Sequence, residues 1–156
     1  MKYFSTGNKS DVVGFKDALL QGLALDGGLY MPKSIPNLGI EFFTSDFTYP
    51  ELAVGMIHPF TKDVLSLNKL TEICESAFAF PLPLKKLNET DSTLELFHGP
   101  TFAFKDFAAR FMARAMSHLI ENDHCLTILV ATSGDTGSAV ANGFLGLNNI
   151  KVVILY

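Results

Sequence analysis

Residues 126–156 read LTILVATSGDTGSAVANGFLGLNNIKVVILY. Two apolar runs, LTILVAT (126–132) and KVVILY (151–156), flank a stretch of small residues from Gly134 to about Gly146. Continuous β-rich runs indicate strands that are buried on both faces, and a helix between two such strands indicates a right-handed parallel βαβ unit. Ligands of such units bind outside the carboxyl ends of the strands. The sequence therefore predicts an α/β fold with a binding site directly after the first strand.

The texture of the sequence changes near residue 80. Upstream, short apolar segments are broken by Gly and Pro, whereas downstream the apolar runs are longer. We therefore expect one domain at 1–80 and a second at 81–156. Periodicity and turn residues predict helices at about 14–22, 49–59, 66–78 and 104–122, and two short strands on either side of a turn at 88–91.

The chain stops at Tyr156, within or at the end of the second predicted strand of the βαβ unit. Domains seldom stop there, because the next crossover is needed to cover the sheet, and two parallel strands do not make a sheet that stands alone. We therefore expect an incomplete βαβ portion of a larger domain. An open apolar strand at 152–155 is expected to favour self-association.

Composition excludes several classes of function. The net charge is −4 and the twelve basic residues are scattered, so there is no basic surface for nucleic acid. No apolar stretch reaches the roughly 18 residues of a membrane span, and the N-terminus has no signal-peptide pattern. Cys74 and Cys125 lack the spacing of a metal site, and a disulfide between them is not expected. We expect a cytoplasmic protein without a metal, nucleic-acid or membrane partner.

Lys105 is the one charged residue predicted on the apolar face of the helix at 104–122. On a helical wheel it lies between Met112 and Met116. A lysine in the first turn can extend past the helix end into solvent. Alternatively, a desolvated lysine has a lowered pKa, and its neutral amine can form a Schiff base with an aldehyde. The wheel leaves both alternatives open, and it places the charges of Asp106, Arg110, Arg114 and Glu121 together on the solvent side.

Two loops flank this lysine in the predicted topology. The loop His98-Gly99-Pro100-Thr101 leads into the lysine helix, and Ser133-Gly134-Asp135-Thr136-Gly137-Ser138 follows the strand at 126–132 and opens a helix. Glycines let a backbone approach a ligand closely, and free N–H groups at a helix N-terminus bind anions. A helix cap by Ser133, with Asp135 in the first turn, is an alternative that is compatible with anion binding. No Gly-Lys-Ser/Thr follows, so a nucleotide P-loop is not indicated.

Several motifs in the same order resemble those of one enzyme family. ELFHGPTFAFKDFAARF at 95–111 resembles the lysine motif of threonine synthases, and ATSGDTGSAVA at 131–141 resembles their second active-site loop. KYFSTGN at 2–8 and ALLQGLALDGGLYMP at 18–32 resemble their N-terminal domain. The resemblance is weakest between residues 38 and 94 and otherwise covers most of the chain.

The resemblance implies a pyridoxal-phosphate-dependent carbon–oxygen lyase, with a threonine-synthase N-terminal domain followed by a tryptophan-synthase-β-like domain. Its reaction converts O-phospho-L-homoserine and water into L-threonine and phosphate, the last step of threonine biosynthesis. Lys105 would hold the cofactor covalently and move protons at the substrate carbons. For the substrate carboxylate, the resemblance implies Ser133, Gly134, Thr136 and Gly137. It places Asp135 beside the cofactor's 3′-oxygen, where the wider fold usually has Asn. His98 and Thr101 would hold the phosphate or the lysine loop, with loop packing as the alternative for these two residues.

One departure from the family concerns the cofactor phosphate. The Gly-Asn-Phe-Gly type loop that binds it in the family is missing, and the nearest string, Asn142-Gly143-Phe144, falls within a predicted helix. We therefore expect the 156-residue chain alone to be inactive and to bind pyridoxal phosphate weakly or not at all. Two other hypotheses stay open: a related phospholyase that acts on a different phosphorylated amine, and a non-catalytic module that mediates assembly through its N-terminal domain.

Overall fold

The chain contains both helices and strands in the computed structural model, which describes residues 1–121, 124–132 and 134–155. The α/β class predicted from the sequence is confirmed. Two compact units are present, Met1–Cys74 and Glu75–Tyr156. The predicted domain division at residue 80 stays a prediction.

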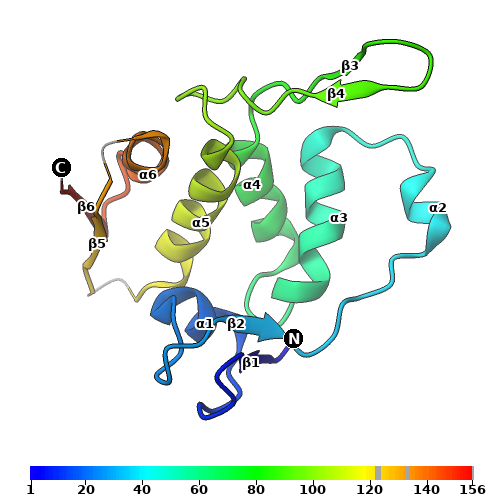
Figure 1. Ribbon diagram of the computed structural model, residues 1–156. Coiled ribbons are helices and arrows are strands. Elements are labelled where there is room, and N and C mark those ends of the chain that lie inside the picture. The colour runs from blue at the N-terminus through cyan, green and yellow to red at the C-terminus, as the bar shows by residue number, and fades with distance from the viewer. Residues whose placement is uncertain (122–123, 133, 156) are drawn as a thin grey trace. The chain divides into compact units, whose positions relative to one another are not determined.

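The first unit combines one small antiparallel sheet with several helices (Figure 1). Tyr3 pairs with Pro32 and Ser5 with Tyr30 in the two strands of the sheet. The helices predicted near 14–22, 49–59 and 66–78 are confirmed, whereas the sheet strands and α2 were not predicted because three to five residues are too few to show a period. The elements are β1 (Tyr3–Ser5), α1 (Phe15–Gln21), β2 (Tyr30–Pro32), α2 (Gly39–Phe43), α3 (Tyr49–Thr61) and α4 (Leu67–Ala77), the last of which ends in the second unit.

Asp26 ties two loops of the first unit together. Its carboxylate accepts hydrogen bonds from the Ser5 hydroxyl at 2.5 Å, from the Lys9 N–H at 2.8 Å and from the Gly28 N–H at 3.0 Å. Gly7 packs so closely on this group that an added Cβ would lie 2.6 Å from the Asp26 carboxyl carbon. The segments that resemble the family's N-terminal domain, 2–8 and 18–32, are therefore joined through one carboxylate.

The Asp26 carboxylate makes the stability of this unit depend on pH. The hydrogen bond from Ser5, followed by those from the Gly28 and Lys9 backbone, holds its pKa well below the usual range. A depressed carboxyl pKa stabilises the fold above the unfolded-state pKa of about 3.9, and this stabilisation is lost as the pH falls from there toward the folded-state pKa. We expect Asp26→Asn to lower the thermal unfolding midpoint by a few degrees at pH 7 and by less at pH 2.5, as measured by circular dichroism.

The control for this prediction is Asp46→Asn, which changes an exposed carboxylate of the same unit. It should leave the midpoint unchanged at both pH values. If Asp26→Asn lowered the unfolding midpoint by the same amount at pH 7 and pH 2.5, the charge of the carboxylate would not contribute to stability.

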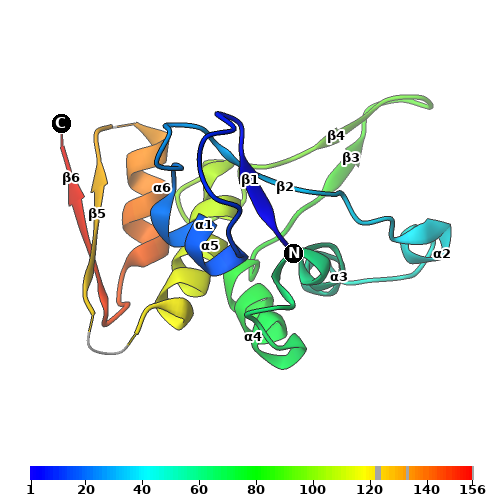
Figure 2. The same ribbon diagram turned by 90° about the horizontal axis from the view of Figure 1, so that it is seen from below.

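The second unit contains the predicted βαβ arrangement. β5 (Leu126–Val130) and β6 (Ile150–Ile154) are parallel, with Ile128 opposite Val152, and α6 (Asp135–Phe144) connects them. Figure 2 shows α6 between this sheet and α5 (Lys105–Leu119). The predicted hairpin is also present, formed by β3 (Leu84–Lys86) and β4 (Ser92–Leu94). The parallel βαβ unit, the hairpin and the long helix are therefore confirmed.

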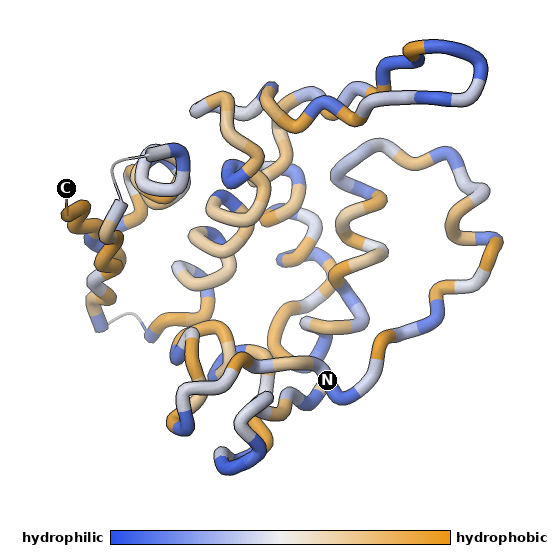
Figure 3. Tube along the Cα trace, viewed as in Figure 1, coloured by the Kyte–Doolittle hydropathy of each residue, from blue (hydrophilic) through white to orange (hydrophobic). Residues whose placement is uncertain are grey.

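Small residues let α5 and α6 approach each other closely. A Cβ added at Gly143 would lie 3.0–3.3 Å from the backbone and Cβ of Ala109, so only glycine fits this contact without a shift. Ala113 and Ala139 are fully buried. On the sheet, alternate residues are partly covered, while Leu129 and Val153 on the other side are exposed. The tube in Figure 3 shows that both strands contain many apolar residues. The exposed side of the sheet combines Leu129 and Val153 with the polar residues Thr127 and Lys151.

The predicted wheel for the helix at 104–122 was right about Glu121, which is exposed, and wrong about Asp106, Arg110 and Arg114. Asp106, predicted on the solvent side, is fully buried. Arg110 and Arg114 are only partly exposed, because Arg110 donates to the carbonyls of Ser76 (2.8 Å) and Ala77 (2.7 Å) at the end of α4 and Arg114 donates to the Ser76 hydroxyl. The face that packs deepest is made of alanines, and a hydropathy wheel weighted by large side chains does not identify it. Lys105 is therefore not the only charge turned toward packed surface.

Candidate active site

Lys105 is the first residue of α5 and is partly buried. Its Nζ lies 3.7 Å from the centroid of the Phe104 ring, in a cation–π arrangement, and Phe104 itself is 57% exposed. The side chain thus lies along the N-terminal end of the helix rather than in the packed core. An amine in this place is open to a carbonyl compound that approaches from the solvent.

The loop before α5 is fixed by hydrogen bonds on both sides. Thr101 donates from its N–H and its hydroxyl to the Asp106 carboxylate, at 2.9 and 2.8 Å. His98 lies 2.6 Å from Glu95 through Nε2 and stacks beside Phe97, with ring centroids 4.7 Å apart. His98 and Thr101 therefore have partners within the loop, as the loop-packing alternative requires.

The second predicted loop begins α6. Gly134 is the N-cap, with extended backbone and no side-chain capping bond, and Asp135 and Thr136 follow as exposed residues of the first turn. The Gly134 N–H donates to the Thr132 hydroxyl at 3.2 Å. Ser133, the predicted cap and carboxylate ligand, lies outside the described residues. Among the described residues, no side chain accepts from the N–H groups of Asp135 and Thr136 in the first turn of α6, as an anion site requires.

Gly137 differs from its neighbours in this loop. It is buried, and an added Cβ would overlap the carbonyl oxygen of Thr132. A glycine is therefore needed where the first turn of α6 packs against the end of β5. This packing explains the residue without a ligand, so the carboxylate role predicted for Gly137 stays a prediction.

The chain topology brings the two loops to one end of the second unit. α5 and α6 run in the same general direction in Figure 2, opposite to β5 and β6, so both helices begin where the strands end. Lys105 and Asp135, as the first residues of their helices, lie at this end. The carboxyl end of a parallel sheet is where ligands of such folds bind.

This end of the unit fits part of a pyridoxal phosphate site. The Lys105 amine is the group that an aldehyde needs, and the N–H groups of Asp135 and Thr136, for which the described residues supply no acceptor, suit a carboxylate or phosphate. Asn142 and Gly143 lie inside α6, so this string is not a phosphate-binding loop, as predicted. The donor set thus includes an amine and one anion site, while a second anion site is not formed by the described residues.

Reasoning from the sequence missed three residues beside Lys105. Asp106 holds the preceding loop, Glu95 orients His98, and Phe104 supports the lysine amine. For Asp106 a signal was available, because an acid in the first turn that follows a Gly-Pro-Thr loop can accept from that loop's N–H groups. Glu95 and Phe104 carry no comparable signal, since exposed acids and aromatics are common in loops.

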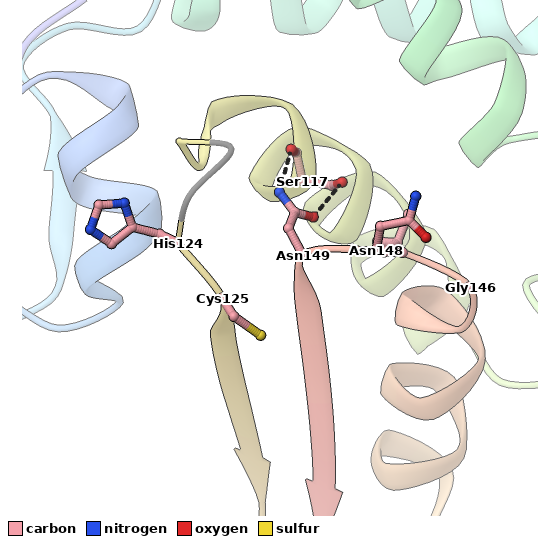
Figure 4. A pocket seen from close by; sticks show the side chains of 7 residues that line it. Ser117, His124, Cys125, Gly146, Asn148 and Asn149 are labelled. Atoms are coloured by element: carbon pink, nitrogen blue, oxygen red, sulfur yellow. Dashed lines mark hydrogen bonds between the residues drawn. The ribbon is translucent and has the colours of Figure 1, made fainter.

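A pocket of the second unit lies at the other end of the sheet (Figure 4). Asn149 joins α5 to the start of β6 there, since its amide oxygen accepts from the Ser117 hydroxyl and its NH₂ group donates to the Ser117 carbonyl, both at 3.0 Å. The lining also includes His124, Cys125 and Asn148. This pocket is at the amino ends of the strands and does not belong to the candidate site.

Two further predictions from the sequence concerned metal sites and membrane-spanning helices. Within residues 1–121, 124–132 and 134–155 there is no group of three side chains suited to a metal ion, and both cysteines are free, Cys74 buried and Cys125 exposed. In the same part of the chain, no helix combines the length and the apolar character needed to cross a membrane.

Solved structures share this fold. The pyridoxal-phosphate-bound threonine synthase of Brucella melitensis matches 99% of the chain with a TM-score of 0.94 and 39% identity, over 35% of its own length. The Escherichia coli threonine synthase structure matches 100% of the chain with a TM-score of 0.89 and 41% identity, over 37% of its length. The α/β fold of the chain is thus the fold of the corresponding part of threonine synthase structures, one of which contains bound pyridoxal phosphate.

Sequence comparison gives the family. The family model "Threonine synthase N terminus" matches residues 2–78. Curated threonine synthases from Escherichia coli and Haemophilus influenzae are 42% and 43% identical to the chain over its whole length. The chain belongs to the threonine synthase family, and it spans 37% and 36% of the length of these two relatives.

Proposed function

We propose that the chain is the N-terminal portion of a threonine synthase that converts O-phospho-L-homoserine and water into L-threonine and phosphate. The observation that carries this proposal is the pairing of Lys105 with the α6 N-terminus at one end of the sheet, in a chain about 40% identical throughout to curated threonine synthases. The rest of the catalytic domain would supply the remaining groups, because the relatives are nearly three times as long.

Lys105 has the central role in this proposal. Its amine would attach pyridoxal phosphate covalently, and the cofactor, when bound, supplies an electron sink for charge that develops at the substrate carbons. As a free base, the same amine would be able to accept a proton from the substrate carbons and, when protonated, to return one. The Phe104 ring, 3.7 Å from Nζ, would help to hold the side chain at the N-terminal end of α5.

The α6 N-terminus would bind the substrate carboxylate. The N–H groups of Asp135 and Thr136 and the positive end of the helix dipole favour an anion there. Asp135 adds a negative charge in the same turn, and beside the cofactor's phenolic oxygen it would need to share a proton to avoid repulsion. Ser133 would complete this loop, while His98 and Thr101 would hold the lysine loop from the other side.

Phosphate release from two substrates tests the proposed reaction. The full-length gene product that contains this chain should release phosphate from O-phospho-L-homoserine at least about 100-fold faster than from ethanolamine phosphate, because the latter has no carboxylate for the α6 N-terminus. Phosphate is measured colorimetrically and threonine by amino-acid chromatography.

The outcomes of this assay separate three functions. Threonine that forms in step with phosphate supports the proposal. Faster release from ethanolamine phosphate would indicate a related phospholyase with another substrate. Release from neither substrate, by folded protein supplied with pyridoxal phosphate, would favour a non-catalytic module that mediates assembly.

A further inference from the structure

Asp106 follows Lys105 directly in the sequence, yet its side chain is completely buried. Burial of a carboxylate is costly unless hydrogen bonds compensate it. Both oxygens are compensated by one residue: Oδ2 accepts from the Thr101 N–H at 2.9 Å and Oδ1 accepts from the Thr101 hydroxyl at 2.8 Å. In the described part of the chain no cation pairs with this carboxylate. Its bonds are therefore directed entirely at the loop that precedes the lysine.

The loop is built around the Asp106 carboxylate. Gly99 packs against it, and an added Cβ there would overlap Oδ2 and lie 2.7 Å from the Asp106 Cβ. The turn closes with a hydrogen bond from the Phe102 N–H to the Gly99 carbonyl at 3.0 Å. Phe102 has a φ of 58°, which is unfavourable for a residue with a side chain, and it is 80% exposed. Little packing holds Phe102 in this conformation, so the turn depends on its own hydrogen bond between Phe102 and Gly99 and on the two bonds from Thr101 to Asp106.

The 99–102 turn also determines where α5 begins. Phe104 is the N-cap and Lys105 the first helical residue, only three residues after Phe102. Consecutive residues of a helix point about 100° apart, so Asp106 faces the packed interior while Lys105 faces the helix end. The carboxylate therefore acts on Lys105 through the backbone of the turn and not as an ion-pair partner.

We propose that Asp106 is the positioning residue for Lys105. By binding both donors of Thr101 it holds the 99–102 turn and the first turn of α5 in the arrangement that presents the amine on the Phe104 ring. This inference rests on the proposed role of Lys105, and it gives a part to Asp106, which has none in the proposed function. A misplacement of a reacting group by about 1 Å can cost on the order of 10²-fold in rate.

The test compares Asp106→Ala with Asp106→Asn in the full-length gene product. Asparagine keeps the shape and can still satisfy Thr101, since its oxygen accepts from the N–H and its NH₂ group donates to the hydroxyl oxygen. If Asp106 positions, Asp106→Ala should lower kcat about 100-fold with little change in KM, because the α6 N-terminus is untouched. Asp106→Asn should recover most of this loss. Glu89→Gln, in the exposed hairpin turn, is the control and should leave both constants unchanged.

Two readouts are independent of turnover. Hydrogen–deuterium exchange should accelerate at least about tenfold at residues 99–104 in Asp106→Ala, because the Thr101 N–H loses its acceptor, and should stay near the wild-type rate in Asp106→Asn. Reduction with borohydride after incubation with pyridoxal phosphate, followed by peptide mass spectrometry, should show slower labelling of Lys105 in Asp106→Ala. These readouts apply even if the substrate of the enzyme differs from the proposed one.

Several results would overturn the inference. Unchanged exchange at 99–104 in Asp106→Ala would show that the carboxylate does not hold the turn. Accelerated exchange with kcat within threefold of wild type would show that the turn does not position Lys105. If Asp106→Asn exchanged normally at 99–104 but lost as much kcat as Asp106→Ala, the loss would come from the charge of Asp106 and not from the position of the turn. If Asp106→Ala does not fold, Thr101→Val replaces it, because it removes the hydroxyl bond alone and should give exchange and kcat between those of the wild type and a complete loss.

Discussion

Replacement of Lys105 by alanine in the full-length gene product is expected to reduce turnover of O-phospho-L-homoserine by at least about 10³-fold, because a covalent catalytic amine is lost. The absorbance of protein-bound pyridoxal phosphate should disappear in the same variant after gel filtration. The other lysines of the second unit lie on β3 (Lys85, Lys86) and on β6 (Lys151), and none begins a helix at the carboxyl end of the sheet. None of them is therefore placed to substitute for Lys105.

Two further variants separate chemistry from structure. Lys105→Arg keeps a cation over the Phe104 ring but has no nucleophilic amine, so it should be as inactive as Lys105→Ala while retaining the wild-type unfolding midpoint. Lys86→Ala changes an exposed lysine of β3 and should retain full activity. Activity of Lys105→Ala within about tenfold of wild type would contradict the assignment of this residue.

The elements that could be predicted are those with a hydropathy pattern that extends over a sufficiently long stretch of sequence. The apolar runs that became β5 and β6 fold as parallel strands, and the small residues between them fold as α6. Helices α1, α3 and α4 also follow their periodicity. The first sheet could not be predicted, since Tyr3–Ser5 and Tyr30–Pro32 are three-residue strands that are held by pairing across 27 residues of chain.

The error at α5 has a different physical cause. A wheel assigns charged residues to solvent, but hydrogen bonding can compensate the burial of a charge when the partners are in place. Asp106 has its partners in Thr101, and Arg110 has them in the carbonyls at the end of α4. Such partners come from loops and helix ends whose position the sequence of α5 does not contain. Alanine burial against Gly143 is likewise a property of two helices together.

The candidate site was predicted in part for a similar reason. The loops at 98–101 and 134–137 could be identified from motifs, because glycines and a lysine in fixed order are visible in one dimension. Their placement at one end of the unit followed from the parallel topology, which the sequence also indicated. What holds each loop in place could not be predicted, because the Asp106–Thr101 and Glu95–His98 contacts depend on side-chain geometry.

A protein of only these 156 residues is expected neither to release phosphate from O-phospho-L-homoserine nor to retain pyridoxal phosphate through extensive dialysis. Lys105 provides an attachment, but a Schiff base alone is reversible, and most affinity for such a cofactor comes from backbone N–H groups around its phosphate. The described residues form one helix N-terminus suited to an anion at this end of the sheet, and Asn142 and Gly143 are committed to α6. The cofactor phosphate and the substrate carboxylate would therefore compete for the same N–H groups.

The sheet of the 156-residue protein should also affect its state in solution. Leu129, Val153 and Leu155 are 68%, 42% and 54% exposed, and β6 pairs only with β5 in the described chain. Apolar strands with an open edge pair readily with other chains, so we expect concentration-dependent self-association in size-exclusion chromatography with light scattering. Val153→Lys, which places a charge on the open side of the sheet, should shift the protein toward the monomer, whereas Lys151→Arg should not. A monomer at all concentrations, or cofactor absorbance that survives dialysis, would show that these residues form a closed and self-sufficient site.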